Sequence, residues 1–160
     1  MVAGLARCTY RSGTCFETRI KDENGGERLS SETGRTRFEG AQPILCVRDL
    51  TATVLYYTDV LGFRNAEWGN DSFTCVSRDG ASIYLCQGGQ GQPGTWVWVG
   101  VEDVSLLYDE YKAKGAHIRM TPRNFPWAYE IHVEDLDGHV LRFGSEPLED
   151  KPFDVGFNGT

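Results

Sequence analysis

The pattern of apolar and polar positions along the chain repeats once. Each copy has a Val two positions before an Asp, an apolar residue directly after that Asp, and a Tyr eight positions after it. The copies are offset by 54 residues and comprise Val47, Asp49, Leu50 and Tyr57, and then Val101, Asp103, Val104 and Tyr111. Alternating apolar residues precede each Asp and helical spacing follows it. The pattern therefore predicts a duplicated unit that begins with a strand and a helix.

The first unit is predicted to be a βαβββ module. A strand is expected at residues 43–47, followed by a helix that Asp49 caps and that ends near residue 60, before Gly62. Turn signals then separate three further strands, expected at residues 63–68, 72–77 and 81–87.

The second unit follows the same order. A strand is expected at residues 96–101 and a helix from the cap Asp103 to about residue 114. Further strands are expected at residues 116–121, 128–134 and 139–144, with a loop at residues 122–127. The predicted fold class is α+β, with two tandem βαβββ modules that form curved mixed sheets around a cleft and carry their helices outside.

Composition separates the first forty residues from the rest. Residues 1–40 carry 7 Lys and Arg against 6 Asp and Glu, whereas residues 41–160 carry 9 against 17. The first segment is rich in Gly, Ser, Thr and Arg and is predicted to be mostly flexible. The predicted organisation is an extension at 1–40, a domain at 41–147 with modules 41–87 and 95–147 around a linker at 88–94, and a loose C-terminal tail at 148–160.

Charge and cysteine content limit the possible partners. The acidic surplus disfavours nucleic acid and anionic membranes and favours cations, although plain solubility explains it equally well. The five cysteines are odd in number and form no Cys-x-x-Cys pair, which fits a reduced, cytoplasmic protein. Cys46, Cys75 and Cys86 are expected to be small buried residues of strands. No stretch has the apolar length of a signal peptide or a membrane span.

Three motifs carry a family resemblance. They are Val-Arg-Asp-Leu at 47–50 with two Tyr at 56–57, Leu-Gly-Phe at 61–63, and Asp-Leu-Asp-Gly-His-Val-Leu-Arg-Phe at 135–143. Together with the repeat, residues 41–147 resemble the vicinal oxygen chelate superfamily, which includes glyoxalase I, extradiol dioxygenases, fosfomycin-modifying enzymes and bleomycin resistance proteins. Because that superfamily contains both enzymes and pure binding proteins, the resemblance implies the fold and leaves the function open.

The resemblance also implies where a metal ligand would lie. Family enzymes place His, Glu or Gln seven residues before the Asp of each repeat and four residues after the turn Gly of each unit. In this sequence those positions hold Gln42, Tyr84, Trp96 and Arg142. Only Gln42 is a plausible ligand, and a positively charged Arg would repel a cation. We therefore expect no family-type metal site and no other cofactor. His117, His132 and His139 have no ligand spacing and are expected to be surface or hydrogen-bonded residues.

Aromatic residues remain as candidate binding groups. Trp96 and Trp98 share one face of a predicted strand, and Trp127 follows a Pro in a polar loop. For Trp98, an ordinary core position is an equally good interpretation. Flat rings in an acidic setting suit a planar, cationic ligand, through stacking and cation–π contact.

The bleomycin resistance branch has a similar pattern of residues. The similarity lies in Pro43, the Phe63 and Trp68 spacing, the Trp-Val-Trp-Val strand at 96–99, and Pro126-Trp127 with Glu130. Members of that branch are metal-free dimers that sequester a cationic, metal-chelating glycopeptide in clefts at the subunit interface, often with the first strand exchanged. The implied ligand-binding residues are Phe63, Trp68, Tyr84, Trp96, Trp98, Trp127, Glu130 and Arg142.

The resemblance therefore implies a metal-independent, homodimeric binding protein without catalytic residues. Two departures are Ala128-Tyr129, where the branch has a Gly, and Arg142, whose charge would oppose a cationic ligand unless Glu130 offsets it. The alternative function is a metal-dependent glyoxalase, lyase or dioxygenase that uses Gln42 and unorthodox ligands. A small-molecule sensor is a third interpretation.

Overall fold

The computed structural model describes residues 19–21, 27–29 and 40–155 of the 160-residue chain. The chain divides into two compact units, Met1–Gly40 and Ala41–Thr160. In the first unit, strands β1 (Arg19–Lys21) and β2 (Glu27–Leu29) pair antiparallel. Apart from the exposed Gly40, the rest of the predicted flexible extension lies outside the described residues.

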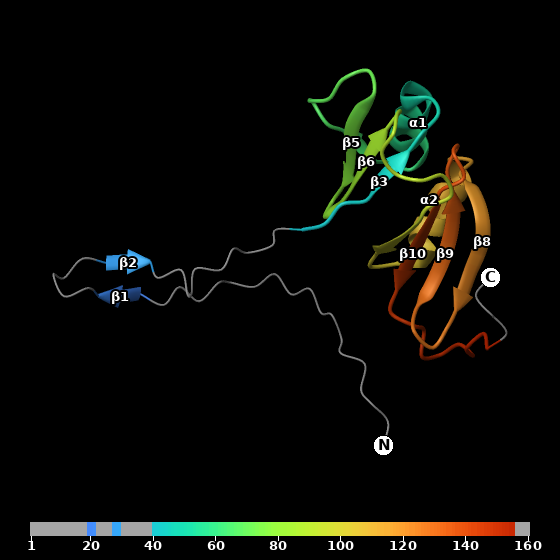
Figure 1. Cartoon of the computed structure of the whole chain (residues 1–160). Helices are drawn as coiled ribbons and strands as arrows, with labels where there is room; N and C mark the ends of the chain where they lie inside the picture. Colours follow the sequence, from blue (N-terminus) through green and yellow to red (C-terminus); the bar gives the residue numbers. More distant parts are fainter. Residues whose placement is uncertain (1–18, 22–26, 30–39, 156–160) are drawn as a thin grey trace. The chain divides into compact units, whose positions relative to one another are not determined.

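The second unit begins with a module that contains one four-stranded sheet (Figure 1). Its elements are β3 (Ile44–Cys46), α1 (Leu50–Leu55), the π-helix η1 (Tyr56–Val60), β4 (Arg64–Asn65), β5 (Phe73–Arg78) and β6 (Ala81–Cys86). The strand order is β3-β6-β5-β4, with β3 and β6 parallel and the other pairs antiparallel. The predicted single α-helix instead changes to π-helical hydrogen bonding at Tyr56, where Leu61 N donates to Tyr56 O.

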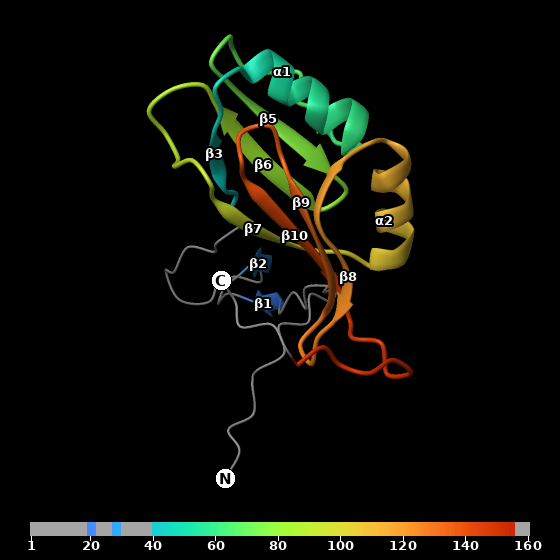
Figure 2. The same ribbon diagram turned by 90° about the vertical axis from the view of Figure 1, so that its right-hand side faces the viewer.

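The second module repeats this topology. Its elements are β7 (Trp96–Gly100), α2 (Val104–Ala113), β8 (His117–Asn124), β9 (Tyr129–Glu134) and β10 (Val140–Ser145). The strand order is β7-β10-β9-β8, and again the first and last strands pair parallel. The predicted fold class, α+β with two tandem βαβββ modules, is confirmed. Figure 2 shows both helices, α1 and α2, outside the sheets.

The repeated Asp residues explain why each helix begins where it does. The Asp49 carboxylate accepts a hydrogen bond from Ala52 N, and the Asp103 carboxylate accepts from Ser105 N and Leu106 N. Each Asp thereby satisfies backbone donors that the first helical turn leaves unpaired. Both predicted N-caps are confirmed.

Two local predictions in the second half of the chain are wrong. The loop expected from Pro122 begins later, because β8 continues to Asn124. Pro122 is tolerated since β8 is an edge strand, and its pairing with β9 shifts register between Met120 and Arg123. The tail is not loose over its described part. The Asn124 side-chain amide accepts from Leu148 N and donates to Leu148 O and Lys151 O. The backbone N–H of Asp154 donates to the backbone oxygen of Asn124.

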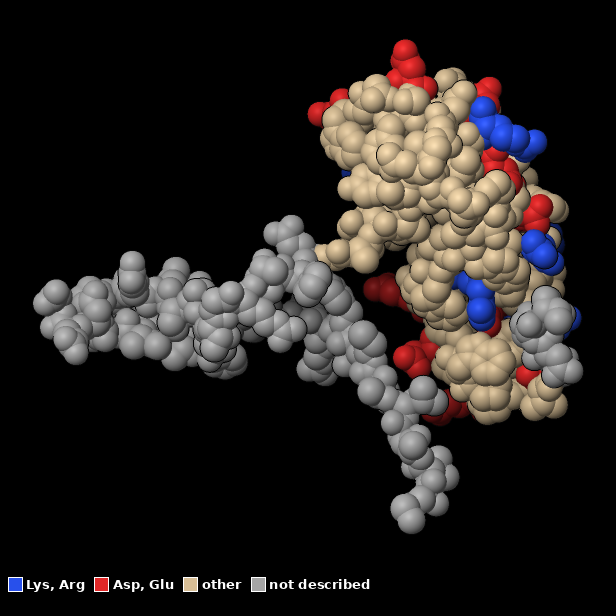
Figure 3. Space-filling model, in the orientation of Figure 1, with Lys and Arg blue, Asp and Glu red and all other residues tan. Residues whose placement is uncertain are grey.

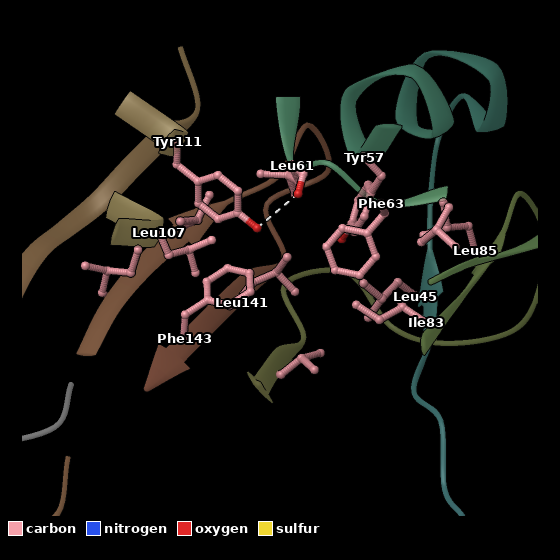
Figure 4. Packing of buried hydrophobic residues seen from close by; sticks show 14 of the residues in the cluster. Leu45, Tyr57, Leu61, Phe63, Ile83, Leu85, Leu107, Tyr111, Leu141 and Phe143 are labelled. Carbon is pink, nitrogen blue, oxygen red and sulfur yellow. Dashed lines mark hydrogen bonds between the residues drawn. The ribbon is translucent and has the colours of Figure 1, made fainter. Parts of the chain in front are cut away.

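One hydrophobic core extends through both modules (Figure 4). The two repeat tyrosines, Tyr57 and Tyr111, are fully buried in it. Tyr57 Oη donates to Asp135 Oδ2 at 3.0 Å, and Tyr111 Oη donates to Leu61 O at 3.2 Å. Burial raises the pKa of both hydroxyls. Each buried hydroxyl therefore has a partner supplied by the opposite module.

The turn between β9 and β10 joins the second module to the first. Asp137 Oδ1 accepts from Arg48 N at 2.9 Å, and its Oδ2 accepts from Thr53 Oγ1 at 2.9 Å. The fully buried His139 accepts from Thr95 N at Nδ1, so its Nε2 carries the proton and donates to Cys46 O at 2.7 Å. The expectation of a hydrogen-bonded His is confirmed for His139.

The three described cysteines are all free, but their placement differs from the prediction. Only Cys86 is buried, whereas Cys46 and Cys75 are half-buried. Cys46 and Cys75 are next to the core residues Leu45 and Val76 in their strands. Because neighbouring residues of a strand point to opposite faces, both cysteines lie on the face of the first sheet that points away from the core. Among the described residues, no helix is long and apolar enough to cross a membrane.

Candidate ligand-binding surface

The sheet of the second module has one face that points away from the core. Val97 and Leu141 pack in the core, so the residues that alternate with them point outward. Strand register places Trp98 beside Arg142, and Arg142 beside His132. We call this surface, with the adjoining loop, the aromatic face; it comprises Trp96, Trp98, Trp127, Glu130, His132 and Arg142.

Three tryptophans are exposed on the aromatic face. Trp96, Trp98 and Trp127 are 46%, 51% and 55% exposed, respectively. The core interpretation of Trp98 is therefore wrong. Large apolar side chains left in solvent together are typical of binding surfaces. Trp96 and Trp127, two of the candidate binding residues, have the exposure that such a role requires.

The carboxylate of Glu130 lies at the centre of the aromatic face and is fully buried. Arg142 Nε donates to its Oε2 at 3.0 Å, and Arg142 Nη2 lies 2.9 Å from Oε1 and 2.8 Å from Oε2. Trp127 Nε1 donates to Oε1 at 3.0 Å. Glu130 thus offsets the charge of Arg142, and its burial keeps it from contacting a ligand directly.

The ring of Trp98 is held by its neighbours on β10. The Arg142 guanidinium lies over this ring, 5.4 Å from its centroid. The ring also covers Gly144, where the Cβ of any other residue would collide with it. Sequence reasoning missed Gly144, although a Gly inside a strand indicates such a close approach.

The ring of Trp127 is supported from behind by a second ring. Phe125 is fully buried and stacks on it, with centroids 4.9 Å apart and planes at 1°. A backbone hydrogen bond from Phe125 N to Ala128 O, 2.8 Å, closes the connection between β8 and β9. One face of Trp127 is therefore packed and the other is available to a ligand.

Trp96 has a different set of neighbours. Its ring meets the buried His132 edge-to-face at 5.4 Å, and the Arg119 guanidinium lies 5.3 Å from its centroid. Arg119 also forms an ion pair with Glu134 at 3.0 Å. Both arginines near the tryptophans are thus paired with carboxylates of β9.

His132 provides a pH-dependent prediction. Burial, the largest effect, lowers its pKa, although the neighbouring Glu130 acts in the opposite direction. The unfolded chain, with a His pKa of about 6.5, therefore takes up a proton more readily than the folded protein. The contribution of this pKa difference to the free energy of unfolding is complete above about pH 6.5. It is lost as the pH falls below that value.

We expect the free energy of unfolding, measured by urea titration at several pH values, to fall on acidification through this range. The fall should be shallower in His132→Gln. The matched control is His117→Gln, because the His117 side chain is 68% exposed. An unchanged pH dependence in His132→Gln would contradict this assignment.

The first module carries a separate cluster of rings. Trp68, Phe73 and Tyr84 lie with ring centroids between 5.4 and 6.5 Å apart, and Trp68 is 54% exposed. Phe73 was not singled out in the sequence, although its position opposite Cys86 places it on the same face as Tyr84.

In Figure 3, uncharged atoms cover most of the upper part of the domain, and charged side chains lie toward its edge.

The structure does not support Phe63 as a ligand-binding residue. Phe63 is only 4% exposed, and its ring meets Tyr57 edge-to-face at 5.6 Å inside the core. Its N–H bonds Tyr57 O at 2.9 Å, so it ends the helical segment and does not belong to an outward-facing strand.

The four positions of family metal ligands do not suit a metal in this chain. Gln42 is exposed just before β3, and Tyr84 belongs to the ring cluster of the first module. Trp96 has no ligating atom, and the Arg142 guanidinium is a cation. Within residues 40–155 and the two short strands, no cluster of three or more His, Cys, Asp or Glu could hold a metal ion.

A family model matches residues 40–143, and its description is the Glyoxalase/Bleomycin resistance protein/Dioxygenase superfamily. The chain belongs to this superfamily. No curated protein matches the sequence significantly. The two-module topology with an equivalent strand order in each sheet is the feature of the structure that agrees with this membership.

Several solved structures resemble the chain. One is the bleomycin-binding protein from bleomycin-producing Streptomyces verticillus in complex with copper(II)-bleomycin, with 26% identity, a TM-score of 0.61, and coverage of 69% of this chain and 98% of that one. The antibiotic-binding protein TnmS3 from Streptomyces sp. CB03234 has 21% identity and a TM-score of 0.61 over 71% and 100% of the two chains. TioX from Micromonospora sp. ML1 has 22% identity and a TM-score of 0.58 over 71% and 100%. At these lower identities, the last two similarities support the fold alone.

Proposed function

We propose that this protein binds and sequesters a bulky aromatic small molecule, and that bleomycin-type glycopeptides are the leading candidates. One observation carries the proposal: the second sheet and its adjoining loop present three exposed tryptophans around the ion pair of the buried Glu130 with the half-buried Arg142. Rings fixed in this way supply stacking area at low cost in side-chain entropy. Binding of this kind requires neither a metal nor a catalytic residue.

The charges on the aromatic face are compatible with a cationic ligand. An unpaired Arg142 would repel one, but the Glu130 carboxylate is hydrogen-bonded to its guanidinium. The acidic surplus of residues 41–160 adds a long-range attraction for cations. The 26% identity with a bleomycin-binding protein supports the same ligand class.

We further propose that two copies of the chain form a homodimer in the cytoplasm and enclose the ligand in clefts between them. The exposed tryptophans of both sheets give each copy aromatic surface that a second copy would partly cover. The first strand is the element proposed for exchange between the copies. The free thiols of the three described cysteines support a reducing compartment.

A fluorescence titration tests this function. Metal-free bleomycin is expected to quench tryptophan emission of the full chain and to saturate at one molecule per subunit, because the exposed rings would stack against the drug. N-acetyltryptophanamide serves as the control for light absorption by the drug, and sedimentation velocity measures the oligomeric state. Absence of quenching at micromolar drug would contradict the ligand assignment.

A further inference from the structure

The guanidinium of Arg142 has one edge that is not used by the protein. Its Nε and Nη2 atoms are bound to Glu130, and one face lies over the Trp98 ring. Among the described residues, no hydrogen bond involves Nη1, and the side chain is 29% exposed. Two N–H donors of a fixed, planar group therefore remain available beside the exposed rings.

The same carboxylate sets the position of Arg142 and of Trp127. Glu130 Oε1 accepts from Trp127 Nε1, while both of its oxygens accept from Arg142. Phe125 packs behind the Trp127 ring, so the indole is held both at its N–H and across one face. A ring and a donor group are thus oriented before any ligand arrives, which reduces the entropy lost on binding.

We propose that the ligand has a flat ring with a hydrogen-bond-accepting oxygen, of the carbonyl or carboxylate class. The oxygen accepts from Arg142 Nη1 while the ring stacks on Trp127. Glu130 is a positioning residue, because it holds both groups and does not contact the ligand itself. The inference rests on the proposed binding function and specifies the chemistry that one part of the ligand must have.

The local charges favour an acceptor over a cation at this point. The Glu130 carboxylate is buried and already hydrogen-bonded to Arg142 and Trp127, and His132 Nε2 lies 3.3 Å from its Oε2, so it is not available to a ligand ammonium group. The face of Trp98 toward Arg142 is occupied by the guanidinium, which removes it as a cation–π surface. Positive groups of a cationic ligand would therefore lie away from Arg142.

The positioning role is tested in the ligand-free full chain by NMR of the four tryptophan indole N–H groups. Trp127→Phe assigns the Trp127 signal. Glu130→Gln, which keeps one acceptor oxygen, is expected to shift that signal, and Glu130→Ala to move it to the position of a water-exposed indole. The control is Glu134→Gln, since Glu134 lies on the same strand and bonds Arg119 instead. An unchanged Trp127 signal in folded Glu130→Gln and Glu130→Ala would overturn the positioning role.

The ligand chemistry is tested with two naphthalene probes that differ in one group. Titrations of 2-naphthoate and 2-naphthylmethylammonium are followed by the Trp127 indole signal. The wild-type protein is expected to bind the carboxylate at least tenfold more tightly. Arg142→Gln should abolish this preference, and Arg142→Lys, which keeps the charge but loses the planar fork, should reduce it at least threefold.

Each outcome of this experiment decides a separate question. Equal or tighter binding of the ammonium probe, or a preference that survives both Arg142 variants, overturns the inference. If the inference is overturned but bleomycin still quenches tryptophan emission, the proposed binding function stands without the inference about the acceptor oxygen. A clear carboxylate preference without any bleomycin quenching supports the inference and rejects the drug as the ligand.

Discussion

Trp127→Ala is expected to weaken bleomycin binding by about thirtyfold, which corresponds to about 2 kcal/mol of binding free energy. The expected loss is large because this ring is preset by Phe125 and Glu130 and offers one free face. Stability should change less than for a core residue, since the side chain is 55% exposed. Isothermal titration calorimetry gives the affinity, and thermal unfolding gives the stability.

The matched control for this variant is Leu106→Ala. Leu106 is 70% exposed and lies on α2, away from the aromatic face, so its truncation removes apolar surface without removing a ring. Its bleomycin affinity should equal that of the wild-type protein. A Trp127→Ala variant that binds bleomycin as tightly as Leu106→Ala would remove Trp127 from the site.

Phe143→Ala is expected to lower the free energy of unfolding by about 3–5 kcal/mol, the usual cost of truncating a buried aromatic residue. Phe143 is 2% exposed and meets Tyr111 edge-to-face at 5.4 Å. Because one core extends through both modules, the variant should still unfold in a single transition. Urea unfolding followed by tryptophan fluorescence and far-ultraviolet circular dichroism measures both quantities.

Phe153→Ala provides the control for this prediction. The Phe153 side chain is 47% exposed, and its truncation should change the free energy of unfolding by no more than about 0.5 kcal/mol. Two separate transitions in Phe143→Ala, one for each probe, would show that the modules unfold independently and would contradict a shared core.

The architecture was predictable because it depends on local patterns. Alternation of apolar residues defined the strands, and Asp49 and Asp103 determined where the helices begin. Since the pattern occurs twice, each module supported the interpretation of the other. The exact ends were harder to predict. The strand expected at 63–68 is reduced to Arg64–Asn65, and β8 runs past Pro122 because an edge strand does not need its N–H.

The candidate site was only partly predictable. Strand alternation placed Trp96 and Trp98 on a common face, and the structure agrees. Phe63 was assigned by the spacing of a resemblance, but its direction depends on how the preceding helix ends, and it packs inside the core. Phe125 and Gly144 act only through their contacts with tryptophans, which the sequence does not reveal.

The sequence by itself determined the duplicated fold and the two tryptophans of β7, because both follow from the periodicity of single elements. The tertiary structure decided how the charges and rings combine. Glu130, Arg142 and Trp127 lie on two strands and a loop, and only the register between β9 and β10 brings them together. The same holds for His139 and Cys46, which are 93 residues apart and form one hydrogen bond. Such contacts depend on the packing of whole elements. The sequence therefore named Glu130 as the carboxylate that would offset Arg142, but only the tertiary structure shows that the two side chains meet.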